Sequence, residues 1–111
     1  MKLPNIDSAI IRPEKLRDYL LSSSHPIGRY KAVFFRSLGY EKDSWTVLES
    51  DIRSLLAADA DEIEITKYGS KYGILGSITG PNGRSANIIS VWIMLTGEGV
   101  PRFVWPILRI E

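Results

Sequence analysis

The sequence lacks cysteine and contains only one histidine among its 111 residues. Without cysteine, the chain has no disulfide, no thiolate nucleophile and no cysteine-bound zinc or iron–sulfur cluster. A single histidine also excludes a histidine-rich metal site. The acids between Asp59 and Glu64 do not have the spacing of a calcium loop, and Gly80–Ser85 does not match a nucleotide-binding glycine motif. We therefore expect no metal and no cofactor.

Long hydrophobic runs are also missing. The longest, from Ile88 to Leu95, is interrupted by Ser90 and is far shorter than the ~20 residues of a membrane span. The first seven residues have no signal-peptide apolar core. We expect a cytoplasmic protein without membrane contact, folded as a single domain over residues 1–111.

Positive and negative side chains are nearly equal in number, and the net charge is +1. The segment from Arg12 to Lys42 nevertheless has seven bases and three acids, a net +4. The segment from Asp43 to Glu64 has seven acids and one base, a net −6. The basic segment could meet phosphate, although charge runs of this kind are often only solvated surfaces.

Apolar periodicity predicts three helices in the first half. Pro13 suits the first turn of a helix with Leu16, Tyr19 and Leu20 on one face. A second helix is expected from Ile27 or Gly28 to Leu38, capped by Gly39, and a third after Asp43 or Ser44.

The second half alternates as strands do. We expect strands over 62–66, 71–79, 86–95 and 102–110, with acids of the first strand facing water and its isoleucines buried. The turn 80–83 joins the second strand to the third. N-terminal helices followed by a four-stranded antiparallel meander form an α+β fold.

The most distinctive stretch is His25-Pro26-Ile27-Gly28-Arg29-Tyr30-Lys31. A helix start followed by Arg29 and Lys31 suits an anion, and a histidine beside it can act as a general acid or base near neutral pH. Metal-free RNA cleavage needs this combination. The alternative is that His25 only packs between two helices.

The sheet offers further candidates. Arg84 beside the turn and Arg102 at the start of the last strand are candidate phosphate contacts, and Ser90 and Tyr72 are candidate polar helpers. Exposed aromatic rings among bases can stack nucleotides. Trp92 is more typical of a core residue, Trp105 before Pro106 indicates an edge strand or bulge, and Tyr72 is expected to be more exposed than Tyr68.

The motif His25-Pro26-x-Gly28-x-x-Lys31-Ala32-x-Phe34 resembles a bacterial family of small domains of unknown function. Gly80-Pro81-Asn82-Gly83-Arg84 and Pro101-Arg102-Phe103-Val104 extend the resemblance over nearly the whole chain. Such domains stand alone or end larger polymorphic-toxin-like proteins. Their layout is similar to the barnase/EndoU/colicin/RelE group of metal-independent ribonucleases, which is an analogy of fold.

The resemblance implies His25 as acid or base, Arg29, Lys31 and Arg84 as phosphate contacts, and Ser90 or Tyr72 as helpers. One departure is the apolar run around Trp105, where a small polar residue is expected. A missing polar partner would leave acid–base catalysis incomplete.

Two functions follow from the sequence. The first is a ribonuclease of the toxin type, acting on RNA and paired with an antitoxin or immunity-type protein. The second is a non-catalytic interaction module or assembly unit, in which the apolar strand from Phe103 to Ile110 provides a pairing edge for a partner or a second copy.

Overall fold

The computed structural model describes residues 1–22, 24 and 29–108. Three helical segments precede the sheet: α1 (Pro13–Lys15) continued by the π-helical turn η2 (Leu16–Leu20), then α2 (Arg29–Ser37) and α3 (Trp45–Ser54). Short 3-10 turns lie at Ile6–Ser8, Lys42–Ser44 and Leu55–Ala57. The strands are β1 (Asp61–Thr66), β2 (Gly69–Thr79), β3 (Ser85–Leu95) and β4 (Arg102–Leu108).

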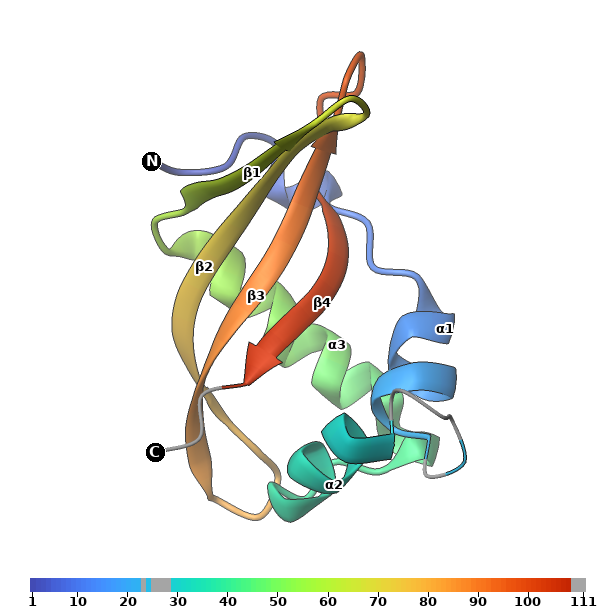
Figure 1. The fold of residues 1–111 in the computed structure, drawn as a ribbon. Helices are drawn as coiled ribbons and strands as arrows, with labels where there is room; N and C mark the ends of the chain where they lie inside the picture. The colour runs from blue at the N-terminus through green and yellow to red at the C-terminus, as the bar shows by residue number, and fades with distance from the viewer. Residues whose placement is uncertain (23, 25–28, 109–111) are drawn as a thin grey trace.

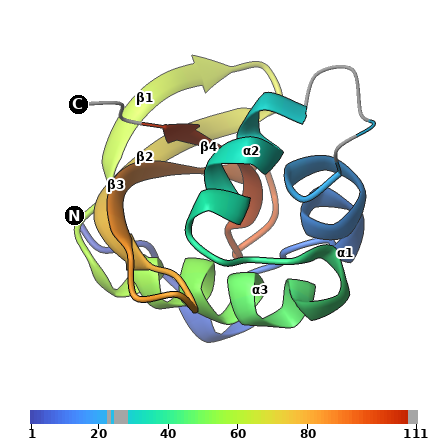
Figure 2. The same ribbon diagram turned by 90° about the horizontal axis from the view of Figure 1, so that it is seen from below.

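The four strands form one antiparallel sheet in the order β1-β2-β3-β4. This confirms the predicted α+β fold with helices first and a meander second. In Figure 1, α3 passes behind the sheet, while α1 and α2 lie beside and below it. Figure 2, seen from below, shows the sheet curving around one side of the molecule and the helices on the other.

The helices start and end where local chemistry dictates. Pro13 occupies the first turn of α1, where its missing N–H is not needed. Gly39 follows α2 with φ +96°, the left-handed conformation expected of a C-terminal cap. Ser44 is the N-cap of α3, but its side chain makes no capping hydrogen bond. The expected start of α2 at Ile27 or Gly28 lies outside the described residues.

One face of the sheet packs against the helices. The largest fully buried side chains come from both layers: Leu16, Leu20, Leu21, Phe35, Tyr40, Leu48, Ile52, Leu56, Ile74, Ile78, Ile88 and Trp92. The core position of Trp92 confirms the sequence prediction. No helix in the described part of the chain has the length and hydropathy that crossing a bilayer requires.

The first strand corrects one expectation. Glu62 and Glu64 are exposed as predicted, but Ile63 and Ile65 are exposed as well, Ile65 by 75%. The pairing register of β1 with β2 shifts between Glu62 and Glu64. Such a shift breaks the strict alternation of faces on an edge strand, so these isoleucines do not follow the pattern that the sequence suggested.

Candidate nucleic-acid interface

Two adjoining pockets lie between α1–η2 and the edge strand β4. The first, of about 300 Å³, is lined by Glu14, Lys15, Tyr19, Val104 and Trp105. The second, of about 360 Å³, is lined by Ile10, Arg12, Lys15, Lys71, Ile93, Leu95, Arg102, Phe103 and Val104. Because Lys15 and Val104 line both, we treat the pockets as one surface, called here the basic groove.

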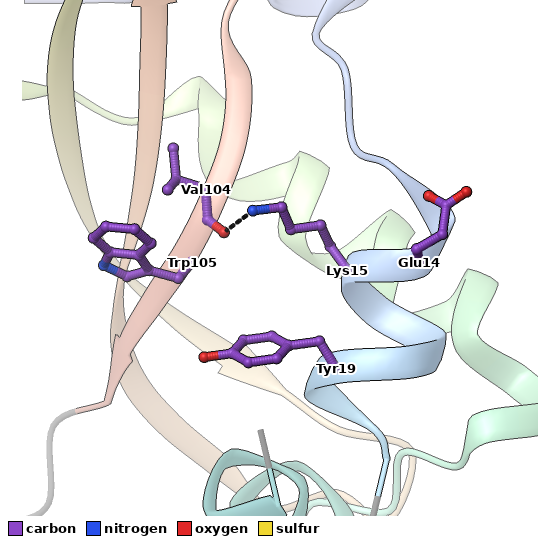
Figure 3. Close-up of a pocket in the computed structure, with 5 residues that line it drawn as sticks. All are labelled: Glu14, Lys15, Tyr19, Val104 and Trp105. Atoms are coloured by element: carbon purple, nitrogen blue, oxygen red, sulfur yellow. Dashed lines mark hydrogen bonds between the residues drawn. The ribbon is translucent and has the colours of Figure 1, made fainter. Parts of the chain in front are cut away.

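Local structure explains how the helical side of the groove forms. The amide of Leu21 donates to the carbonyl of Leu16 at 2.9 Å, five residues back, as in a π-helical turn. This wide turn buries Leu16 and Leu20 and leaves Tyr19 partly exposed. Tyr19 therefore points from η2 toward the sheet edge (Figure 3).

Lys15 bridges the two sides of the groove. Its Nζ donates to the backbone carbonyl of Val104 at 3.0 Å, as Figure 3 shows. Partial burial lowers the pKa of Lys15, and the positive charges of Arg12 and Lys31 lower it further. Arg12 and Lys31 therefore lie close enough to Lys15 to repel its charge, and a bound anion would offset this repulsion.

Two more cations lie against aromatic rings of the groove. Lys31, in the first turn of α2, has its Nζ 5.3 Å from the centre of the Tyr19 ring and 3.4 Å from the Tyr19 hydroxyl. Lys71 of β2 has its Nζ 4.8 Å from the centre of the Trp105 ring. These contacts fix both rings and keep positive charge beside them.

Carboxylates neutralise only part of this charge. Lys71 pairs with Glu64 at 3.2 Å, and Arg102 makes two hydrogen bonds to Glu98 at 2.7 and 3.0 Å. Arg12 and Lys15 form no ion pair with a carboxylate of the described residues. The groove therefore has the unneutralised bases and aromatic rings that single-stranded nucleic acid binds.

The residues that the sequence singled out divide into three groups. Lys31 and Arg102 border the basic groove, whereas His25 lies outside the described residues. Arg29 is exposed on α2, where its guanidinium stacks on Tyr30 and donates to the Tyr30 hydroxyl at 3.0 Å. Only part of the predicted set is therefore assembled by the described residues.

Arg84 lies elsewhere. Its hairpin contacts the C-terminal end of α2, because Asn82 bonds the carbonyls of Ser37 and Leu38. Arg102 lies opposite Ile93 in β3, nine residues from Arg84, which is about 30 Å along an extended strand. One phosphate cannot contact both arginines.

The two predicted polar helpers are buried to different degrees. Ser90 is completely buried; its hydroxyl accepts a hydrogen bond from Trp92 Nε1 at 2.9 Å and donates to the Ile74 carbonyl at 3.4 Å. Its position suits a structural role in the core. Tyr72 is partly buried against the core, whereas Tyr68 is 64% exposed. The expectation that Tyr72 is the more exposed ring is therefore wrong.

The groove includes five residues that the sequence did not assign to a site: Arg12, Lys15, Tyr19, Lys71 and Trp105. The signal that could have found Lys15 and Tyr19 is their spacing of four residues, which places them on one helical face. No local signal connects them to β4. Among residues 1–22, 24 and 29–108, no group of three His, Asp or Glu side chains is placed to hold a metal ion.

Comparison with known proteins gives a family and a fold. The family model "Domain of unknown function (DUF6883)" matches residues 2–107. A chain in the solved structure of a contact-dependent growth inhibition toxin–immunity protein complex from Klebsiella pneumoniae 342 superposes with a TM-score of 0.72 and 21% sequence identity. The alignment covers 96% of this chain and 97% of that one. No match was found among curated proteins.

Proposed function

We propose that this chain, which belongs to the DUF6883 family of domains of unknown function, is an RNA-binding domain of the toxin type with metal-independent ribonuclease activity. The observation that carries the proposal is the basic groove. It brings Arg12, Lys15, Lys31 and Lys71 beside Tyr19 and Trp105. Cations hold the phosphates of a single strand and aromatic rings accept its bases, whatever their sequence.

The proposed reaction is an intramolecular transesterification of the RNA backbone. A general base removes the proton of a ribose 2′-hydroxyl, whose oxygen attacks the neighbouring phosphorus while an acid protonates the departing 5′-oxygen. The products are a 2′,3′-cyclic phosphate and a free 5′-hydroxyl. His25 enters this proposal from the sequence alone, as the single histidine of the chain, a residue type whose ordinary pKa lies near neutral pH. The cations stabilise the charge that develops on phosphorus-bound oxygens.

Cleavage in a chelator tests the activity. Purified chain is incubated with single-stranded RNA in EDTA, and the ends are analysed for 2′,3′-cyclic phosphate. We expect cleavage, and we expect His25→Ala to lower its rate by at least about 100-fold, the usual contribution of an acid–base group. Lys67→Ala, which removes an exposed base outside the groove, should cleave at the wild-type rate. Intact RNA at micromolar protein would contradict the enzymatic part of the proposal.

A second function, docking of a partner protein, is favoured by a different observation. Ile63, Leu75 and Ile107 are exposed apolar side chains on the strands, and the similar chain from Klebsiella pneumoniae comes from a toxin–immunity complex. Exposed apolar patches often mark protein interfaces. Light scattering of the purified chain, alone and with the product of the neighbouring gene, would detect such a complex.

Pairing through the edge of β4 has less support than the sequence suggested. Ile10 exchanges backbone hydrogen bonds with Pro101 and Phe103, both at 2.9 Å, and Lys15 binds the Val104 carbonyl. Pro106 has no N–H to donate. These groups occupy or interrupt the free edge from residue 101 to 106, and this is one way in which proteins prevent edge-to-edge association.

A further inference from the structure

The first pocket of the basic groove has the lining of a site for one planar ring. Tyr19 comes from η2 and Trp105 from β4, and both residues line the pocket with Lys15 and Val104. In Figure 3 the Tyr19 ring and Lys15 approach β4 from one side, and the Trp105 indole extends from the other side of the strand. Its volume of about 300 Å³ is at the low end of small-molecule pockets. A single heterocycle fits such a space better than a larger ligand.

From this arrangement we infer that the pocket binds one unpaired nucleobase of a single-stranded RNA, in contact with Tyr19 and Trp105, which line it. The inference rests on the proposed RNA binding and adds a subsite to it. Stacking on aromatic rings is the usual way in which proteins hold bases of single strands.

Polar atoms of the pocket suit the edge of such a base. Lys15 Nζ is a donor and the Val104 carbonyl is an acceptor, and the two atoms are 3.0 Å apart. An oxygen has two lone pairs, so the Val104 carbonyl can accept a second hydrogen bond while Lys15 is bound. A Watson–Crick edge offers a donor next to an acceptor, and only an unpaired base has that edge available.

Charge on both sides of the pocket suits the backbone of the same strand. Lys31 lies against Tyr19, and Lys71, which also pairs with Glu64, lies against Trp105, so a base in the pocket would have a basic side chain on either side for its flanking phosphates. This is why a nucleotide strand, rather than an uncharged apolar ligand, is the occupant that the groove favours.

The test compares two decamers with equal numbers of phosphates. One is 2′-O-methyl RNA, which cannot be cleaved because it lacks the attacking hydroxyl, and the other is its abasic counterpart. Fluorescence anisotropy measures both dissociation constants at one salt concentration. We expect the decamer with bases to bind wild-type chain about 5- to 150-fold more tightly, the range that stacking contributes.

Substitutions of Tyr19 and Trp105 test whether the pocket causes the preference for the decamer with bases. Trp105→Leu and Tyr19→Leu should bring the affinity ratio close to one, whereas Trp105→Phe and Tyr19→Phe, which keep a ring, should retain most of the ratio. The matched control is Tyr68→Leu, because Tyr68 is also an exposed tyrosine under a lysine, with Lys67 Nζ 5.1 Å from the ring centre, but lies outside the groove.

The outcomes separate the two proposals. Equal affinity of wild-type chain for both decamers would overturn the base pocket and leave phosphate binding in place. Binding of neither decamer would overturn the proposed RNA binding together with the pocket. An equal loss in Tyr68→Leu would show that exposed rings in general, and not this pocket, account for the preference. Thermal melts of each variant confirm that the measured protein is folded.

Discussion

Trp92 and Trp105 lie on neighbouring strands of the same sheet, but the chain surrounds their rings in opposite ways. Trp92 is completely buried, its indole N–H donates to Ser90, and its ring meets the edge of Phe103 at 5.2 Å between centres. Trp105 is 38% exposed, has Lys71 over its ring and lines an open pocket.

The polar groups of the core and those of the basic groove differ in how completely they are paired. In the core, no buried side-chain nitrogen or oxygen of the described residues lacks a hydrogen-bond partner. Tyr40, for example, donates its hydroxyl to Asp51 at 2.5 Å and to the Thr79 carbonyl at 3.3 Å. In the groove, by contrast, the positive charges of Arg12 and Lys31 act on Lys15 and lower its pKa.

Because of this difference, we expect polar residues of the core to contribute to stability and basic residues of the groove to contribute to binding. A polar group that is fully paired in the core stabilises the fold, and its removal leaves a partner without a bond. Like charges that lie close together at a surface repel one another and do not stabilise the fold, and binding of an anion lowers this repulsion. Variants of the core should therefore lower the free energy of unfolding, and variants of the groove should lower RNA affinity alone.

The largest expected effect is that of Ser90→Ala on stability. The substitution leaves the buried Trp92 N–H without an acceptor, and we expect a loss of about 2 kcal/mol in the free energy of unfolding. Urea titration should show a lower midpoint with an unchanged slope. Ser77→Ala, at an exposed position of β2, should change stability by less than about 0.5 kcal/mol. Loss of RNA cleavage at unchanged stability would instead place Ser90 in the reaction.

The second effect should appear in binding. We expect Lys15→Met with Lys31→Met to weaken binding of single-stranded RNA about 10-fold and to flatten the plot of log affinity against log salt by about 1.4, since each cation neutralises one phosphate. Stability should change little, because burial and neighbouring charges lower the pKa of Lys15 and so disfavour its charged form. Lys67→Met is the matched control. A change in stability without a change in the salt slope would contradict the comparison.

The third effect, of Tyr40→Phe, depends on pH. Burial raises the pKa of Tyr40 above its ordinary value of 10.0, and the hydrogen bond to Asp51 raises it further. The folded state therefore favours the protonated phenol, and this stabilisation is fully present below pH 10 and lost as the pH rises above it. We expect a cost of about 1 kcal/mol at pH 7 and a smaller difference from wild type at alkaline pH. An equal difference at both pH values would contradict this.

Local patterns predicted the elements better than the surface. Leu16, Leu20 and Trp92 are buried as their spacing and neighbours indicate, and Gly39 adopts the left-handed conformation that ends a helix. These properties depend on a few adjacent residues. The isoleucines of β1 were misjudged because their burial depends on which elements cover an edge strand, and the sequence of that strand does not contain this information.

The basic groove could not be predicted for a related reason. Its central contact joins Lys15 to Val104, 89 residues apart, and it forms because the returning strand β4 lies at the edge beside α1. The sequence identified Trp105 as an edge-strand residue, which the topology confirms, and placed Tyr19 on the apolar face of a helix. Only their juxtaposition gives them a shared pocket.

The smallest expected effect is that of Arg84→Ala, which examines whether exposed positive charge alone explains binding. Arg84 is exposed at the hairpin that contacts the C-terminal end of α2, about 30 Å along β3 from Arg102. We expect RNA affinity to change less than 2-fold and stability by less than about 0.5 kcal/mol. Anisotropy against the same decamer and a urea titration measure both. If Arg84→Ala weakened binding as much as Lys15→Met combined with Lys31→Met, the bound RNA would have to contact the hairpin as well as the groove.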